Sequence, residues 1–245
     1  MDERQLLDEQ VAYYRARASE YDEWFLRQGR YDRGPEHRAR WFREIAVIED
    51  VLRSTLPRGD ALELACGTGL WTRHVADASV RMLAVDASPE AIAINRDRVR
   101  SPNVDYQVAD IFSWTSDRMF DVVFFSFWLS HVPASQFDAF WTAVRGRIRP
   151  GGQAFFVDGL LEPTSTARDH QAPDASGRVR RRLNDGREFQ IVKVFHEPSR
   201  LERQLHERGW HGWVRSTATF FLYGSMTPTR SQRAGRATHP EIERT

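Results

Sequence analysis

Short apolar runs alternate with amphipathic segments between about residues 58 and 158. Runs such as 82–86 and 120–126 are too short for helices and are rich in Val and Phe. The segments between them place apolar residues at helical spacing. Strands that alternate with helices form a parallel sheet with helices on both faces. The pattern therefore predicts an α/β fold, a doubly wound, Rossmann-like sheet.

Helical periodicity also dominates the part of the chain that precedes the sheet. We expect one helix over residues 5–28 and a second over 36–56, where Trp41, Ile45 and Ile48 recur at helical spacing. A loop rich in glycine and charge joins them. Residues 1–57 are therefore predicted to form an N-terminal helical cap.

The alternation breaks after about residue 160. Segment 160–186 contains Pro, Ser, Gly and the basic run Arg178–Arg182, and we expect an inserted lid there. The elements that follow are predicted to be a strand, a helix and a strand, at 187–196, 198–209 and 210–223. The main domain would then span 58–224. Residues 225–245, which contain few apolar side chains, are predicted to be a disordered tail.

Composition narrows the class of protein. The 245 residues are 41% hydrophobic and 28% charged, with a net charge of +1, which gives no electrostatic case for nucleic acid or membrane partners. The chain has one cysteine, no apolar run long enough to cross a bilayer and no apolar signal segment near Met1. We expect a cytoplasmic protein, a monomer or homodimer, that acts on a small molecule.

A glycine turn carries the main functional signal. The run Glu63-Leu-Ala-Cys-Gly-Thr-Gly69 joins a strand to a helix, and its glycines let a nucleoside cofactor approach the backbone. Asp86 ends the next strand, about 20 positions later, as expected for a carboxylate that binds ribose hydroxyls. Asp110 ends the third strand and could contact an adenine.

Two cofactor classes use such a turn. Dinucleotide enzymes need a third glycine, where this chain has Thr72. S-adenosylmethionine has no pyrophosphate and needs only room at the turn, a carboxylate and a polar adenine contact. The pattern favours S-adenosylmethionine; NAD titration would test the dinucleotide alternative, and binding without turnover would indicate a non-catalytic nucleoside-binding module.

These motifs, in this order, resemble those of the class I S-adenosylmethionine-dependent methyltransferases. The resemblance covers about residues 6–224 and includes Phe120–Ser126 and Ile148–Gly152. It implies a seven-stranded, mostly parallel sheet with an antiparallel final strand and no metal ligands. Trp71 could contact the cofactor or fill the core. The cofactor-binding residues implied are Tyr14, Glu63, Ala65, Gly67, Trp71, Asp86, Ala87, Asp110, Ile111 and Ser126.

Candidate substrate residues lie at a strand end and around the lid. His131 follows the fourth strand, where it could act as a general base, bind substrate or simply pack. Lys193 is the only lysine among 35 basic residues, and Arg178–Arg182 lies nearby in the sequence. A compact ammonium beside guanidinium groups suits a phosphonate or carboxylate, although a solvated basic face would have the same composition.

Three segments, 13–22, 128–133 and 181–195, resemble phosphonate O-methyltransferases of dehydrophos biosynthesis, whereas 25–41 is longer here and richer in arginine. The resemblance implies that Tyr14 contacts the cofactor and that His131, Arg181 and Lys193 face the anionic group of the substrate. We predict S-adenosylmethionine-dependent O-methylation of a small phosphonate or carboxylate. The alternative is N- or C-methylation of a neutral aromatic or amine metabolite.

Overall fold

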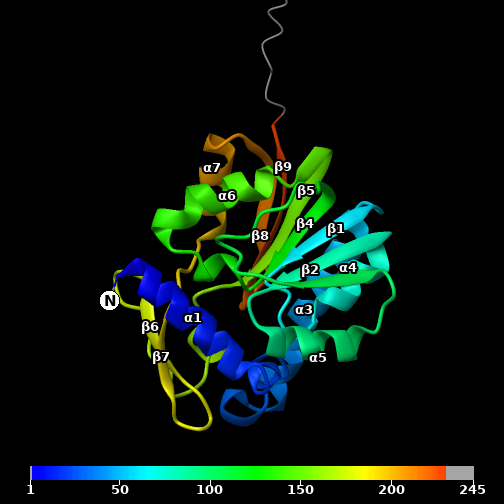
Figure 1. Ribbon diagram of the computed structural model, residues 1–245. Coiled ribbons are helices and arrows are strands. Elements are labelled where there is room, and N and C mark those ends of the chain that lie inside the picture. Colours follow the sequence, from blue (N-terminus) through cyan, green and yellow to red (C-terminus); the bar gives the residue numbers. More distant parts are fainter. Residues whose placement is uncertain (1, 230–245) are drawn as a thin grey trace, which may run out of the picture.

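The computed structural model describes residues 2–229, and its centre is the predicted α/β sheet (Figure 1). Seven strands follow the order β3-β2-β1-β4-β5-β9-β8. Strands β1 to β5 are parallel, and β9 runs antiparallel to both β5 and β8. The predicted fold class is therefore confirmed. The strand bounds are β1 Asp60–Leu64, β2 Arg81–Asp86, β3 Val104–Val108, β4 Phe120–Ser126, β5 Ile148–Gly159, β8 Trp210–Ser216 and β9 Phe221–Pro228.

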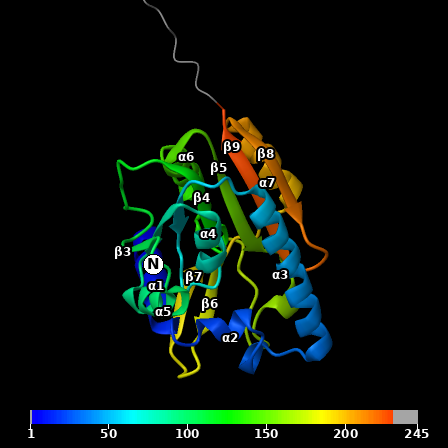
Figure 2. The same cartoon turned by 90° about the vertical axis from the view of Figure 1, so that its right-hand side faces the viewer.

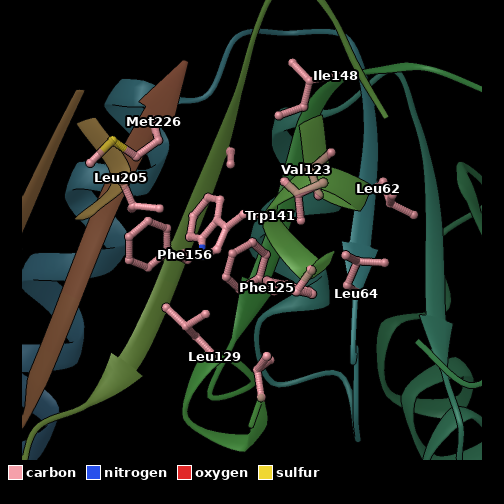
Figure 3. Close-up of a cluster of buried hydrophobic side chains, with 14 of the residues drawn as sticks. Leu62, Leu64, Val123, Phe125, Leu129, Trp141, Ile148, Phe156, Leu205 and Met226 are labelled. Atoms are coloured by element: carbon pink, nitrogen blue, oxygen red, sulfur yellow. The ribbon is translucent and has the colours of Figure 1, made fainter. Parts of the chain in front are cut away.

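Helices cover both faces of the sheet (Figure 2). Helices α3 (Pro35–Thr55), α4 (Thr72–Ala78) and α5 (Pro89–Val99) lie on one face. Helices α6 (Phe137–Arg145) and α7 (Pro198–Glu207) bury their apolar sides on the other. There Trp141 meets the Phe156 ring edge-on, 5.6 Å between centroids (Figure 3). No helix among the described residues is long and apolar enough to cross a membrane.

The N-terminal cap differs from the single helix predicted over residues 5–28. Helix α1 (Glu3–Arg17) ends at a turn, and a short α2 (Tyr21–Phe25) and the 3₁₀ turn η1 (Gly29–Tyr31) follow. The sequence carries no Pro or Gly at this break. Tertiary contacts hold the new direction, since the Trp24 indole Nε1 donates to the Ser165 carbonyl at 2.8 Å.

The lid contains more regular structure than the sequence indicated. Strands β6 (Arg178–Arg182) and β7 (Glu188–Val192) form a separate antiparallel hairpin, and 3₁₀ turn η4 covers Pro163–Ser165. No strand was predicted at 178–182. Val179 and Arg181 point inward while Arg180 and Arg182 are exposed. Because arginine occupies both inward and outward positions, the alternation of apolar and polar residues that is typical of a strand is not visible in the sequence. Helix α1 lies beside this hairpin (Figure 1).

The C-terminal part also departs from prediction. The expected strand over 210–223 is two strands, β8 and β9, joined by a turn that includes Thr217 and Thr219. Strand β9 continues to Pro228, so the predicted tail cannot begin at residue 225. Residues 230–245 of that predicted tail lie outside the described residues.

Candidate active site

The turn after β1 forms one wall of the site, and its geometry explains both glycines. Gly67 and Gly69 have φ angles of +52° and +89°. A Cβ at Gly69 would lie 2.5 Å from Oδ1 of Asn95, on α5. A Cβ at Gly67 would meet nothing within 4 Å. Gly67 therefore presents bare backbone to open space, as a closely bound cofactor requires.

Asp86 is held at the end of β2 by backbone donors. Its Oδ2 accepts from the Gly67 N–H and its Oδ1 from the Ser88 N–H, both at 2.8 Å. Burial raises the pKa of Asp86. Each carboxylate oxygen keeps a second lone pair, so Asp86 can still accept hydrogen bonds from ribose hydroxyls. These residues fit an S-adenosyl nucleoside.

Most of the predicted cofactor-binding residues come together around one cavity, here called the cofactor cavity. Helix α1 closes one side of it with Leu7, Gln10 and Val11. The predicted residues that line it are Tyr14, Ala65, Gly67, Asp86, Ala87, Asp110, Ile111 and Ser126.

Glu63 and Trp71 lie outside that lining. Glu63 is 1% exposed, and burial raises the pKa of its carboxyl to about 8. Trp71 is buried among the rings of Phe25, Phe124 and Phe127. Its place in the core agrees with the packing interpretation of this residue.

A second cavity, the substrate cavity, adjoins the first. Its lining includes His131, Arg181 and Lys193, which the sequence proposed as substrate residues. Four residues line both cavities: Tyr14, Tyr21, Phe127 and His131. The predicted substrate residues are therefore grouped beside the cofactor cavity, although they come from two distant parts of the chain, the segment after β4 and the β6–β7 hairpin.

Lys193 is partly buried, with 17% of its side chain exposed, and its charge is only partly neutralised. Its Nζ donates to Ser130 Oγ at 2.7 Å and lies 3.8 Å from Oδ1 of Asp158. Asp158 Oδ2 also accepts from the Ser130 N–H. Burial is the main cause that lowers the pKa of Lys193 to about 8, against the attraction of Asp158. The Lys193 side chain is therefore mostly protonated at neutral pH and loses its proton as the pH rises through about 8.

Arg181 projects inward from β6 and is 7% exposed. One guanidinium nitrogen, Nη1, donates to the carbonyl of Gln171 at 3.1 Å. Burial lowers the pKa of Arg181, which nevertheless stays charged. Among the ion pairs of residues 2–229, none involves Arg181.

Arg17 is a third cation of this cavity, and the sequence reasoning missed it. It lines the substrate cavity, is 8% exposed, and donates through Nη2 to Tyr31 Oη at 3.1 Å. Its Nε has no hydrogen-bond partner within the described chain. The sequence contained a signal for Arg17, because Tyr13, Arg17 and Tyr21 recur every four residues. In the structure the Arg17 guanidinium lies over the Tyr21 ring, 5.1 Å from its centroid.

His131 connects the two cavities through Tyr14. Its Nδ1 lies 2.7 Å from the Val192 carbonyl, which can only accept, so Nδ1 carries the proton. Nε2 then accepts from Tyr14 Oη at 2.8 Å. Burial and Lys193 hold the pKa of His131 well below 6.5. His131 is thus a neutral imidazole whose basic lone pair already accepts the hydrogen bond from Tyr14 Oη.

Comparison with known proteins shows which family the chain resembles. Residues 61–152 match a family model described as a methyltransferase domain. The structure of DhpI bound to S-adenosylhomocysteine is 39% identical, with a TM-score of 0.76, over 94% of this chain and 100% of that one. The complex of DhpI with S-adenosylmethionine and HEP gives 40% identity and the same TM-score, over 93% and 100% of the two chains.

A curated relative matches over a shorter stretch. Nodulation protein S of Sinorhizobium fredii is 32% identical over 77 residues. That match spans 30% of this chain and 36% of the relative, so the chain is aligned with about a third of that protein's length.

Proposed function

Because this chain belongs to the class I S-adenosylmethionine-dependent methyltransferases, we propose that it methylates an oxygen of a small anionic metabolite, a phosphonate or a carboxylate. One observation carries this proposal. Three cations line the cavity that adjoins the cofactor cavity, namely the buried Arg17 and Arg181 and the partly buried Lys193.

The cost of burying these charges indicates an anionic ligand. Removing an ion from water costs several kcal/mol unless an opposite charge compensates it. Within residues 2–229, Lys193 alone among these three cations has a carboxylate within 4.0 Å, and that carboxylate, Asp158, already accepts from the Ser130 and Gly159 backbone. A phosphonate or carboxylate would supply the missing negative charge and accept charge-assisted hydrogen bonds from both guanidinium groups.

The chemistry then follows from positioning. When bound, S-adenosylmethionine supplies a methyl group on a positively charged sulfur that keeps the electron pair of the broken S–CH₃ bond. Arg17, Arg181 and Lys193 would hold the anion so that one oxygen faces the cofactor cavity. That oxygen is already deprotonated and forms the new O–CH₃ bond with its own electron pair, so no proton has to move. His131 would act as a positioning residue that orients Tyr14.

A phosphonate is favoured over a carboxylate by two findings. Three segments around this cavity resemble phosphonate O-methyltransferases, and the DhpI complex that also holds HEP matches over nearly the whole chain. Arginine pairs with phosphonate oxygens in the same two-point geometry that it uses for phosphate.

Turnover on a panel of acceptors tests the proposal. The enzyme is incubated with methyl-labelled S-adenosylmethionine and methylphosphonate, acetate, phenol or benzylamine, and product mass is measured. We expect label on the phosphonate or the carboxylate. Label on phenol or benzylamine alone would refute the proposal in favour of methylation of a neutral acceptor, in which case His131 and Tyr14 become the proton-accepting pair.

A matched pair of variants localises the effect. Arg180 and Arg181 are neighbours on β6 that point to opposite faces. Arg181→Met should lower kcat/KM for the anionic acceptor by about 10- to 150-fold, the range of a hydrogen bond to a charged group. Arg180→Met, which removes an exposed guanidinium of the same strand, should leave it within about twofold.

A further inference from the structure

The substrate cavity has apolar as well as cationic lining residues. The apolar ones, here called the apolar wall, include Trp24, Phe127, Leu160, Leu161 and Phe195, the last with its ring centroid 5.4 Å from the Lys193 Nζ. Each of these side chains is partly exposed, and Leu161 is 67% exposed, the highest value among the large apolar residues of the described chain. The cations and this apolar wall belong to one continuous cavity.

We propose that the anionic group methylated by this enzyme carries a bulky apolar body, an aryl or arylalkyl group, that lies against Trp24 and Phe127. This inference rests on the proposed function and narrows it to arylalkyl phosphonates or carboxylates. The head group would meet Arg17, Arg181 and Lys193, and the body would cover the apolar wall.

The wall is preorganised to receive a planar group. Trp24 meets Phe127 edge-to-face at 4.7 Å between ring centroids, and Trp41 meets Trp24 at 5.4 Å and nearly perpendicular. Trp41 is fully buried and donates its Nε1–H to the Phe25 carbonyl. Trp24 is fixed in turn by its hydrogen bond to Ser165. Aromatic side chains that are already held in place lose little entropy when a ring packs on them.

The structure also leaves room for that body. Gly159, at the end of β5, lines the same cavity, and a Cβ there would meet nothing within 4 Å. Its backbone is not in the positive-φ region, so glycine is not required there by conformation. A compact substrate such as methylphosphonate would leave Leu161 exposed and this space filled with water. An arylalkyl group would bury apolar surface on both partners.

The test compares two phosphonates that differ only in the apolar body. We would measure kcat/KM for methylphosphonate and for 2-phenylethylphosphonate with purified enzyme and methyl-labelled S-adenosylmethionine. We expect at least a tenfold preference for the phenylethyl compound. Equal or lower kcat/KM for that compound would overturn the inference and leave the proposed function intact. Turnover of neither phosphonate, with label on neutral acceptors, would overturn both.

Two variants test the location of the body. Gly159→Leu fills the open space and should lower the preference for the phenylethyl compound at least tenfold. Leu161→Ser removes apolar surface at an exposed position that folding does not require, and should lower the same ratio about threefold or more. Val80→Ser, which changes a 55% exposed apolar residue that lines neither cavity, is the matched control and should keep the wild-type ratio. A ratio unchanged in both cavity variants would contradict the proposed position.

Discussion

Replacing Lys193 by arginine gives a direct test of the anion site. The variant keeps a cation at this position but extends the pH range over which that cation is charged. Burial lowers the pKa of Lys193 to about 8, whereas an arginine guanidinium stays charged at every accessible pH. The protonated ammonium is the form that attracts an anion. Its contribution is therefore complete below pH 8 and is lost as the pH rises through that value.

The size of the effect follows from the chemistry of the pair. A hydrogen bond to a charged partner contributes about 1.5 to 3 kcal/mol, which corresponds to about 10- to 150-fold in kcat/KM. Above its pKa the charged fraction of Lys193 falls tenfold per pH unit. The profile of kcat/KM reports groups of the free enzyme, so the pKa of Lys193 without substrate is the relevant one.

The assay is the ratio of kcat/KM between wild type and Lys193→Arg with one phosphonate across the neutral to alkaline range. The titration of the substrate itself cancels in this ratio. We expect a level ratio below pH 8 and a falling ratio above it, by up to the full 10- to 150-fold. A ratio that does not change between neutral and alkaline pH would show that the Lys193 charge does not act on the substrate and would refute the anion site.

Three further predictions follow. The ratio of kcat/KM between wild type and His131→Ala, measured with one phosphonate so that the titration of the substrate cancels, should be about tenfold or less and stay level as the pH falls through 6.5, because the pKa of His131 lies well below that value. A ratio that falls steeply near pH 6.5 would restore the role of general base. Gly69→Ala should cost about 1 to 3 kcal/mol of unfolding free energy in denaturant titrations, because its Cβ meets Asn95, whereas Gly67→Ala should cost less stability and weaken cofactor binding measured by calorimetry. Glu63→Gln should raise the unfolding free energy of the cofactor-free protein at neutral pH by up to about 3 kcal/mol. Between the ordinary pKa of 4.5 and about 8, folding has to keep the buried carboxyl protonated, and this costs free energy that a neutral amide does not cost. The gain should vanish below pH 4.5, and equal denaturation midpoints at neutral pH would contradict the raised pKa of Glu63.

The cofactor cavity was largely predictable because its determinants are local in sequence. A glycine turn after a strand, and acids at the ends of the next two strands, meet at one edge of any parallel sheet. Asp86, Gly67 and Asp110 therefore lie where the pattern places them. The sequence left two interpretations of Trp71 open, a cofactor contact or a core residue. Only its packing against Phe25 and Phe124 showed that it belongs to the core.

The substrate cavity was predictable in part. Lys193 and Arg181 were selected because a single lysine and a basic run are unusual in this composition, yet the run gave no sign that 178–182 is a strand. The turn that separates α1 from α2 carries no local signal either. The turn depends on a partner more than a hundred residues away, Ser165 for Trp24, and the hairpin that contains 178–182 packs through β7 against the equally distant helix α1.

The sequence by itself determined the fold class, the cofactor and most of the residues that line the cofactor cavity, since these follow from periodicity and from spacing along neighbouring elements. The tertiary structure decided that Arg17, Arg181 and Lys193 share one cavity, that His131 already accepts a hydrogen bond from Tyr14, and that aromatic side chains line the same cavity as the cations. Side-chain direction and burial decide these points, and both are set by packing between segments that are distant in the chain.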